Sequence, residues 1–367
     1  MKNILVVPHI GLSGGAGLYI KQILSEIKGE FNISFTGRYA NDYDSSSPNC
    51  VDNQIADIIF PYYEGVSSKA TVYYFFLSMY KLIKVFLSKK TVKRYDAILL
   101  TSGIQMLVIL LVPYVFKQAK VIILIQENWR LDGWIFGAIS RYLCSRSDLV
   151  VSITKSWSDK AERAGIESYV YRNMYAMPEN VSADSFNEKK FDFVYFGGDQ
   201  KIKGFEQLVE FCYRLSRLRS IRVGILGELS KDSINKLKSS VNSYNGSEVV
   251  FFGFLDDTSH VLKVSKILLL PITAPHFCRP AIEAGFFRIP FLIPNYPGIS
   301  DFAKDKFNCS MYGSTDEMIT SALKILDDSE CLNKLGSNNY ILSRDFVYSA
   351  NSGVKLLEAI KGALNEN

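Results

Sequence analysis

A glutamate and an arginine lie where a short helix should begin, directly after a buried strand. The apolar run 267–270 stops at Pro271, which is typical of a strand covered on both faces. Helical spacing starts near Arg279, and Glu283 follows four residues later on the same helix face. The first turn of such a helix offers backbone N–H groups and a positive dipole end to an anion. The stretch therefore predicts a phosphate site, with Glu283 placed to accept hydrogen bonds from ribose hydroxyls.

We expect the N–H groups of Phe277, Cys278 and Arg279 to face that anion, with His276 in the loop before them. A parallel doubly wound sheet binds ligands outside the carboxyl ends of its strands, where this junction must lie. A solvated ion pair between Arg279 and Glu283 explains the same spacing equally well when the segment is taken alone.

Two glycine-containing loops follow other predicted strands. Lys203-Gly204 ends the loop after the strand predicted at 191–196, and its compact ammonium charge suits a diphosphate. A loop lysine is, however, more often only solvated. Gly14 and Gly15 lie in a glycine-rich turn that precedes a helix expected at 18–27. The glycines of that turn lack the G-x-G-x-x-G order, which argues against a nicotinamide dinucleotide site.

The segment from Pro280 to Gly285, followed by Pro290 and by Asn295 to Gly298, resembles the donor-site signature of family 4 retaining glycosyltransferases. These enzymes have the GT-B fold, and the resemblance is to members that build bacterial surface polysaccharides. Lys203-Gly204 resembles the lysine–glycine pair whose ammonium meets the donor diphosphate in that family. The resemblance implies a nucleoside-diphosphate sugar, of the UDP, GDP or dTDP type, as the donor.

Two positions depart from the family pattern. The first of its two glutamates would fall at Pro275, and its phosphate-binding arginine would fall at Gly198. We expect Gly198 to remain part of the donor-phosphate site, with Lys201 or Arg279 supplying the missing charge.

The resemblance brings three further residues to the site. Gly14-Gly15 match a turn that lets the donor phosphates and the acceptor approach the backbone, although a tight strand-to-helix turn alone would also explain them. Glu127 follows the strand predicted at 121–125 and takes a position that contacts the donor sugar in many members; a structural carboxylate is equally consistent. The catalytic residues implied are Lys203, Glu283 and Glu127.

Composition excludes several other classes of protein. The chain has 367 residues, of which 48% are hydrophobic and 22% charged, enough for two full domain cores. Its six cysteines and three histidines lack the short spacings of a zinc site or a disulfide framework, so we expect reduced thiols and no metal. A net charge of +5 gives little reason to expect a nucleic-acid partner. No signal-peptide pattern and no apolar run of ~20 residues are present, so we expect a cytoplasmic protein.

Aromatic and aliphatic residues are interleaved with lysines from Phe76 to Arg94. At helical spacing Phe76, Tyr80, Ile83 and Leu87 share one face. Such a basic amphipathic helix can lie on an anionic membrane surface. A core-facing aromatic stripe with a solvated lysine edge is the alternative that we favour slightly.

Strands and helices alternate along both halves, which predicts an α/β protein with doubly wound, Rossmann-like parallel sheets. The resemblance implies that two such domains face a cleft, the GT-B architecture. We expect an acceptor-side domain at 1–173, a linker at 174–190 and a donor-binding domain at 191–344. A C-terminal helix within 345–367 is expected to pack back on the first domain.

The function expected from the resemblance is that of a retaining hexosyltransferase in cell-surface polysaccharide synthesis. It would need no cofactor and would act on a glycan or lipid-linked glycan, at the inner face of the membrane where it is peripheral. Another GT-B activity, such as a nucleotide-sugar epimerase or an inverting transferase, is one alternative. A non-catalytic subunit that binds a sugar nucleotide is another, and the departures at Pro275 and Gly198 favour it.

Overall fold

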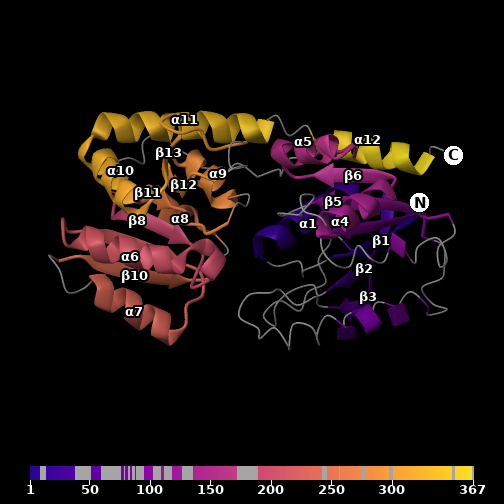
Figure 1. Cartoon of the computed structure of the whole chain (residues 1–367), viewed down its shortest axis with the longest axis horizontal. Helices are drawn as coiled ribbons and strands as arrows, with labels where there is room; N and C mark the ends of the chain where they lie inside the picture. The colour runs from indigo at the N-terminus through magenta and orange to yellow at the C-terminus, as the bar shows by residue number, and fades with distance from the viewer. Residues whose placement is uncertain are drawn as a thin grey trace. The chain divides into compact units, whose positions relative to one another are not determined.

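The chain forms two compact units, Met1–Met174 with Ser349–Asn367, and Tyr175–Tyr348 (Figure 1). Each unit has its own parallel sheet and its own hydrophobic core. The computed structural model describes residues 1–8, 14–37, 51–58, 76–77, 79–81, 83–84, 87, 95–101, 109–110, 118–125, 135–171, 189–241, 246–255, 257–274, 278–296, 301–348 and 352–365.

The first unit contains a seven-stranded sheet in the order β3-β2-β1-β4-β5-β6-β7, with every strand pair parallel. The chain order reverses between β1 and β4, which makes the sheet doubly wound. Its elements are β1 (Lys2–Val7), α1 (Gly14–Ile27), β2 (Phe31–Gly37), β3 (Asn53–Ile58), β4 (Ala97–Thr101), β5 (Lys120–Ile125), α4 (Ile135–Ser145), β6 (Leu149–Ser152), α5 (Lys155–Arg163), β7 (Tyr169–Val170) and α12 (Ser352–Asn365).

Helix α12 brings the end of the chain back to the first unit, where it packs against α1, β5 and β6. Lys361 Nζ lies 2.9 Å from a carboxylate oxygen of Glu30, just after α1. Lys2 Nζ donates a hydrogen bond of 2.8 Å to the carbonyl oxygen of Leu364. Polar contacts therefore tie both the first strand and the turn after the first helix to the last helix.

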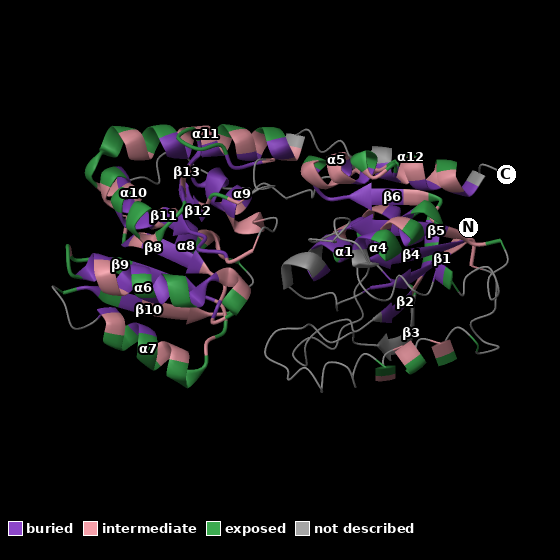
Figure 2. Cartoon of the chain, in the orientation of Figure 1, coloured by how far each residue is buried: buried purple, intermediate pink, exposed green. Residues whose placement is uncertain are grey.

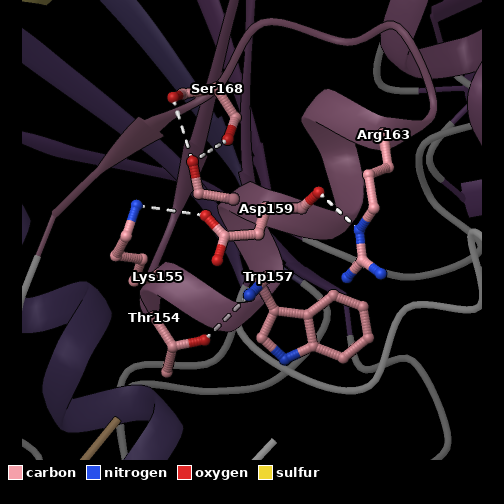
Figure 3. A network of polar contacts seen from close by, with 7 residues as sticks. Thr154, Lys155, Trp157, Asp159, Arg163 and Ser168 are labelled. Atoms are coloured by element: carbon pink, nitrogen blue, oxygen red, sulfur yellow. Dashed lines mark hydrogen bonds and ion pairs between the residues drawn. The ribbon is translucent and has the colours of Figure 1, made fainter.

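Helix α5 shows how local side chains fix a strand-to-helix step in this unit (Figure 3). Thr154 is its N-cap residue, and its hydroxyl oxygen accepts a 3.3 Å hydrogen bond from the backbone N–H of Trp157. Lys155 and Asp159 pair one turn apart at 3.1 Å, and Arg163 Nε donates to the carbonyl of Asp159. A capped first turn and a basic last turn are what a short surface helix needs.

The second unit contains a six-stranded parallel sheet in the order β10-β9-β8-β11-β12-β13. Its order again reverses once, between β8 and β11. Its elements are β8 (Phe191–Phe196), the 3₁₀ turn η2 (Lys201–Lys203), α6 (Phe205–Ser216), β9 (Arg222–Leu226), α7 (Lys231–Val241), β10 (Glu248–Gly253), α8 (Ser259–Lys263), β11 (Ser265–Leu269), α9 (Arg279–Phe286), β12 (Phe291–Pro294), β13 (Cys309–Tyr312), α10 (Thr315–Asp327) and α11 (Ser329–Tyr348).

Hydrophobic clusters cover both faces of this second sheet. Figure 2 shows its strands mostly buried, while the helices expose one side. Leu268 and Leu269 at the middle of the sheet are completely buried, as the short apolar run in the sequence predicted. The predicted fold class, two doubly wound parallel sheets, is confirmed.

Two sequence-based expectations in the first unit are corrected. Helix α1 begins at Gly14 rather than at Leu18, so Gly14 and Gly15 belong to its first turn. Phe76, Tyr80 and Leu87 expose 64%, 63% and 67% of their surfaces, so they are not a core-facing stripe. Helical spacing identifies which residues share a face, but it does not say whether the core or the solvent meets that face.

A buried carboxyl group joins α1 to the end of β7. Tyr171, which is completely buried, donates its hydroxyl proton to Oε1 of Glu26, while Glu26 Oε2 is buried without a hydrogen-bond partner among the described residues. Burial raises the pKa of Glu26, and the hydrogen bond from Tyr171 opposes this only in part. The folded chain therefore binds this proton more tightly than the unfolded chain does.

We expect Glu26→Gln to stabilise the protein increasingly as the pH rises from 4.5, the ordinary pKa of glutamate, until it passes the raised pKa of the folded state, above which the difference is constant. Below the ordinary pKa the carboxyl is protonated in both states, whereas above its raised folded pKa the charge must be buried. Urea unfolding at several pH values would measure the difference between variant and wild type. Glu162→Gln, at an exposed position of α5, is the control; a pH-independent difference for Glu26→Gln would contradict the prediction.

Candidate functional site

Helix α9 begins at the carboxyl end of the central strand β11, as the sequence predicted. Cys278 is its N-cap residue and makes no side-chain cap hydrogen bond, and Pro280 lies in its first turn. Cysteine is a poor cap, so the side chain leaves the positive end of the helix dipole without the oxygen that Ser, Thr or Asp would supply. This helix end is suited to an external anion. His276 and Phe277 lie outside the described residues.

Arg279 and Glu283 form an ion pair along α9, with Nε 2.6 Å from Oε1. Their side chains are only 32% and 24% exposed, so this is a partly buried pair rather than a freely solvated one. The contact fixes the glutamate side chain in one orientation. The guanidinium has further N–H donors in a rigid plane, which a phosphate oxygen can share.

Lys203 is held by its backbone, because each carbonyl of η2 accepts a hydrogen bond. Tyr195 at the end of β8 donates its hydroxyl proton to the carbonyl of Lys203 at 3.3 Å. Thr273, after β11, donates its N–H to Ile202 O at 3.0 Å and its hydroxyl to Lys201 O at 3.1 Å. The turn that carries Lys203 is therefore fastened to the segment that leads into α9.

Gly204 makes this fastening possible. It has a φ of +80°, and a Cβ atom there would lie 1.6 Å from the carbonyl oxygen of Pro271. Only glycine has both the conformational freedom and the missing side chain that this approach requires.

The surroundings of Gly198, in the loop after β8, leave no room for an arginine side chain at this position. Its φ is +59°, and a Cβ atom would lie 2.2 Å from the carbonyl oxygen of Glu228. Gly227, after β9, is equally crowded, because its Cβ would lie 2.5 Å from the backbone nitrogen of Gly198. The two loops meet backbone to backbone, so any larger side chain at Gly198 would force them apart.

Lys203 and the N-terminus of α9 are close enough to interact electrostatically. Burial raises the pKa of the Cys278 thiol to about 11, and the charge of Lys203 acts in the opposite direction. The thiol is therefore neutral at pH 7. A cationic ammonium, a neutral N-cap and a helix dipole lie together at the carboxyl edge of the sheet.

Two buried asparagine side chains form a hydrogen-bonded pair that contacts the backbone of α9 and of Ile289, which follows it. Asn339 of α11 donates to the carbonyls of Ala281 and Ile289 at 3.2 and 2.7 Å, and Asn308 donates to Asn339 Oδ1 at 3.1 Å. Both asparagines are completely buried. Because the buried amides satisfy carbonyls at both ends of α9, the helix has a fixed position relative to α11.

The second unit thus brings together five of the predicted residues, Gly198, Lys203, Cys278, Arg279 and Glu283, at one edge of its sheet. Gly14 and Gly15 belong to the first unit, and Glu127 lies outside the described residues.

Sequence analysis missed Tyr195 and Thr273, which position Lys203. For Tyr195 the available signal was a tyrosine within a predicted apolar strand. Its side chain is completely buried, and a buried hydroxyl usually has a hydrogen-bond partner. Within the described ranges, no group of three or more His, Cys, Asp or Glu residues could hold a metal ion.

Residues 177–341, which contain Gly198, Lys203, Cys278, Arg279 and Glu283, match the family described as "Glycosyl transferases group 1". No curated protein sequence matches the chain.

Solved structures resemble the whole chain. HepE from Anabaena, solved in complex with UDP, is 14% identical with a TM-score of 0.74, covering 99% of this chain and 100% of HepE. Sucrose-phosphate synthase from Thermosynechococcus elongatus is 12% identical with a TM-score of 0.75 and full coverage of both chains. The lipopolysaccharide outer core galactosyltransferase WaaB is 14% identical, has a TM-score of 0.62 and covers 95% of this chain and 99% of its own. The fold is therefore that of GT-B glycosyltransferases.

We expect Gly204→Ala to lower the free energy of unfolding of the second unit more than Gly253→Ala does. Gly253 has a similar φ of +68°, but a Cβ atom there would meet nothing within 4 Å. The control therefore carries only the left-handed strain of roughly 1–2 kcal/mol. Gly204→Ala adds the clash with Pro271, worth a further ~1–3 kcal/mol if the backbone shifts as in an overpacked core. Urea unfolding would compare the two, and equal losses would contradict the close approach.

Proposed function

We propose that this chain, a glycosyltransferase with the GT-B fold, transfers a sugar from a nucleoside-diphosphate sugar to a glycan or lipid-linked glycan and retains the anomeric configuration. The observation that carries the proposal is the juxtaposition of Lys203 with the N-terminus of α9, where Arg279 begins the helix and pairs with Glu283 one turn further in. The binding of UDP by HepE, which has the same fold, supports a nucleoside diphosphate as the ligand of this edge.

The chemistry follows from the charge that develops on the leaving group. When the bond between the anomeric carbon and the β-phosphate oxygen breaks, its electron pair stays on the diphosphate. Lys203, Arg279 and the positive end of α9 are placed to stabilise that charge. Glu283, oriented by Arg279, accepts hydrogen bonds from the ribose hydroxyls. The acceptor oxygen forms the new bond to the anomeric carbon, and the departing phosphate oxygen takes the proton of the acceptor hydroxyl. The step therefore needs no separate base, and positive groups of the chain meet the diphosphate in place of a metal.

The first unit takes the acceptor in this proposal. Gly14 and Gly15 lie in the first turn of α1 and add no side chains of their own there. Glu127 would contact the donor sugar. The product would be a cell-surface polysaccharide, made in the cytoplasm at the inner face of the membrane.

One structural observation favours a second candidate, a non-catalytic subunit that binds the sugar nucleotide. Position 198, where the family resemblance expects an arginine, has no room for a side chain. Such a subunit would keep nucleotide binding and lose turnover.

We expect one of UDP, GDP, dTDP or ADP to bind the purified protein, and Lys203→Met and Glu283→Gln each to weaken that binding by at least ~10-fold. A charge-assisted hydrogen bond to phosphate or ribose contributes roughly 1.5–3 kcal/mol. Isothermal titration calorimetry would measure the dissociation constants, after a thermal-shift screen has chosen the nucleotide. Lys334→Met, at an exposed position of α11, is the matched control for loss of one lysine charge.

The binding measurements, followed by an assay of hydrolysis, distinguish the retaining glycosyltransferase from the non-catalytic subunit. Binding that survives both variants, or no binding to any of the four nucleotides, would refute the donor site. The corresponding α-linked sugar nucleotide would next be followed by NMR during slow hydrolysis. Initial release of the α-anomer supports retention, the β-anomer indicates inversion, and binding without release favours the non-catalytic subunit.

The exposed residues Phe76, Tyr80 and Leu87 support a contact with an anionic membrane, because Lys81 and Lys84 are exposed beside them. Apolar side chains beside lysines are the pattern of an interfacial helix. In the described part of the chain, no helix combines the length and apolarity needed to cross a bilayer.

We expect the protein to co-sediment with vesicles containing phosphatidylglycerol, and the double variant Lys81→Glu/Lys84→Glu to reduce binding by at least ~10-fold. Each lysine near an anionic surface contributes about 1 kcal/mol, and reversal of its charge adds repulsion. Lys334→Glu is the control. Unchanged sedimentation of the double variant, or equal binding to neutral phosphatidylcholine vesicles, would exclude the electrostatic contact.

A further inference from the structure

Tyr312, the last residue of β13, has a buried hydroxyl group with no hydrogen-bond partner among the described residues. Its side chain is 7% exposed, and its ring packs in the hydrophobic cluster that includes Leu292 and Ile319. A buried hydroxyl without a partner destabilises the folded protein, because it gave up its hydrogen bonds to water and gained none. Such a group requires an explanation.

The position of Tyr312 in the sheet places it at the phosphate site. It lies at the carboxyl end of its strand, in register with Pro294 of β12. The N–H of Asn295 donates to its carbonyl oxygen at 2.8 Å, and Tyr296 follows directly. All strands of this sheet are parallel, so this end of β13 lies at the same edge as the end of β11, which leads into α9.

The groups that influence the pKa of the Tyr312 hydroxyl include a residue of that site. Burial raises the pKa of Tyr312, and Tyr296 and Cys278 raise it further. Cys278 is the N-cap of α9 and is itself influenced by the charge of Lys203. The Tyr312 hydroxyl therefore stays protonated and can donate a hydrogen bond.

We propose that the Tyr312 hydroxyl donates a hydrogen bond to a phosphate oxygen of the bound nucleoside diphosphate, so that its missing partner arrives with the substrate. This inference rests on the proposed function and adds a residue to its donor site. The contact supplies a donor on the β13 side of α9, whereas Lys203 approaches from the β8 side. A hydroxyl suits a site that already holds positive groups, because it adds no charge that repels them.

A second buried hydroxyl in the same unit provides a matched control. Ser343 of α11 is completely buried, and its Oγ also has no hydrogen-bond partner among the described residues. It packs against Gly285, near the end of α9 that is remote from the phosphate site. Removal of the Ser343 hydroxyl should therefore affect the stability of the free protein and leave its affinity for a nucleotide unchanged.

The test compares Tyr312→Phe and Ser343→Ala, each in the full chain. The probe is whichever of UDP, GDP, dTDP and ADP gives the largest thermal shift with wild type. We expect Tyr312→Phe to keep or raise the melting temperature of the free protein and to weaken nucleotide binding about 10- to 100-fold, as for a lost hydrogen bond to a charged group. Ser343→Ala should also keep or raise the melting temperature, with the dissociation constant unchanged.

Three outcomes would overturn the inference. An unchanged dissociation constant in Tyr312→Phe would refute it while leaving the donor site intact. A lower melting temperature of free Tyr312→Phe would show that the hydroxyl already has a partner within the chain. Failure of the wild type to bind any of the four nucleotides would remove the proposed function itself, and this contact with it.

Discussion

The close approach of two backbone segments at Gly204 and Pro271 determines where the positive charge of the second unit lies. Gly204 ends the turn η2 in a left-handed conformation, with no room for a Cβ atom against the Pro271 carbonyl. Thr273, two residues after that proline, then reaches the carbonyls of the turn. Main-chain contacts consequently fix the backbone from which the flexible Lys203 side chain extends. A long lysine that starts from a fixed backbone loses less entropy when it meets an anion.

Close backbone packing also explains why two positions in the loops at this edge of the sheet carry no side chain. At Gly198 and Gly227 the loops after β8 and β9 meet so closely that neither position can carry a side chain. The arginine that the family pattern places at Gly198 could not be restored by one substitution without moving both loops. Positive charge must therefore come from the β11–α9 side, where Arg279 and the helix N-terminus lie, and from Lys203. The glycine at position 198 therefore matches the close backbone packing around it.

Short buried strands and the start of α9 could be predicted from the sequence because their signals are local. A four-residue apolar run that stops at Pro271, and Pro280 in a first helical turn, have few other interpretations. The exposure of Phe76 could not be predicted, because the pattern does not say what covers a helix face. The start of α1 at Gly14 was also missed, because glycine has low helix propensity and tertiary context overrode it. The crowding at Gly198 depends on a carbonyl 30 residues away in the sequence, which no local pattern records.

The ionisation of the side chains at this edge favours a multiply charged anion. The Cys278 thiol stays neutral because burial raises its pKa to about 11. The carboxylate of Glu283 is paired with Arg279, so its charge is balanced before any ligand arrives. Asp199, in the loop after β8, accepts hydrogen bonds that lower its pKa, foremost from the N–H of Ser230, and these direct its charge toward the loop after β9. The thiol of Cys278 thus adds no negative charge, and the carboxylates of Glu283 and Asp199 are each bound to groups of the chain.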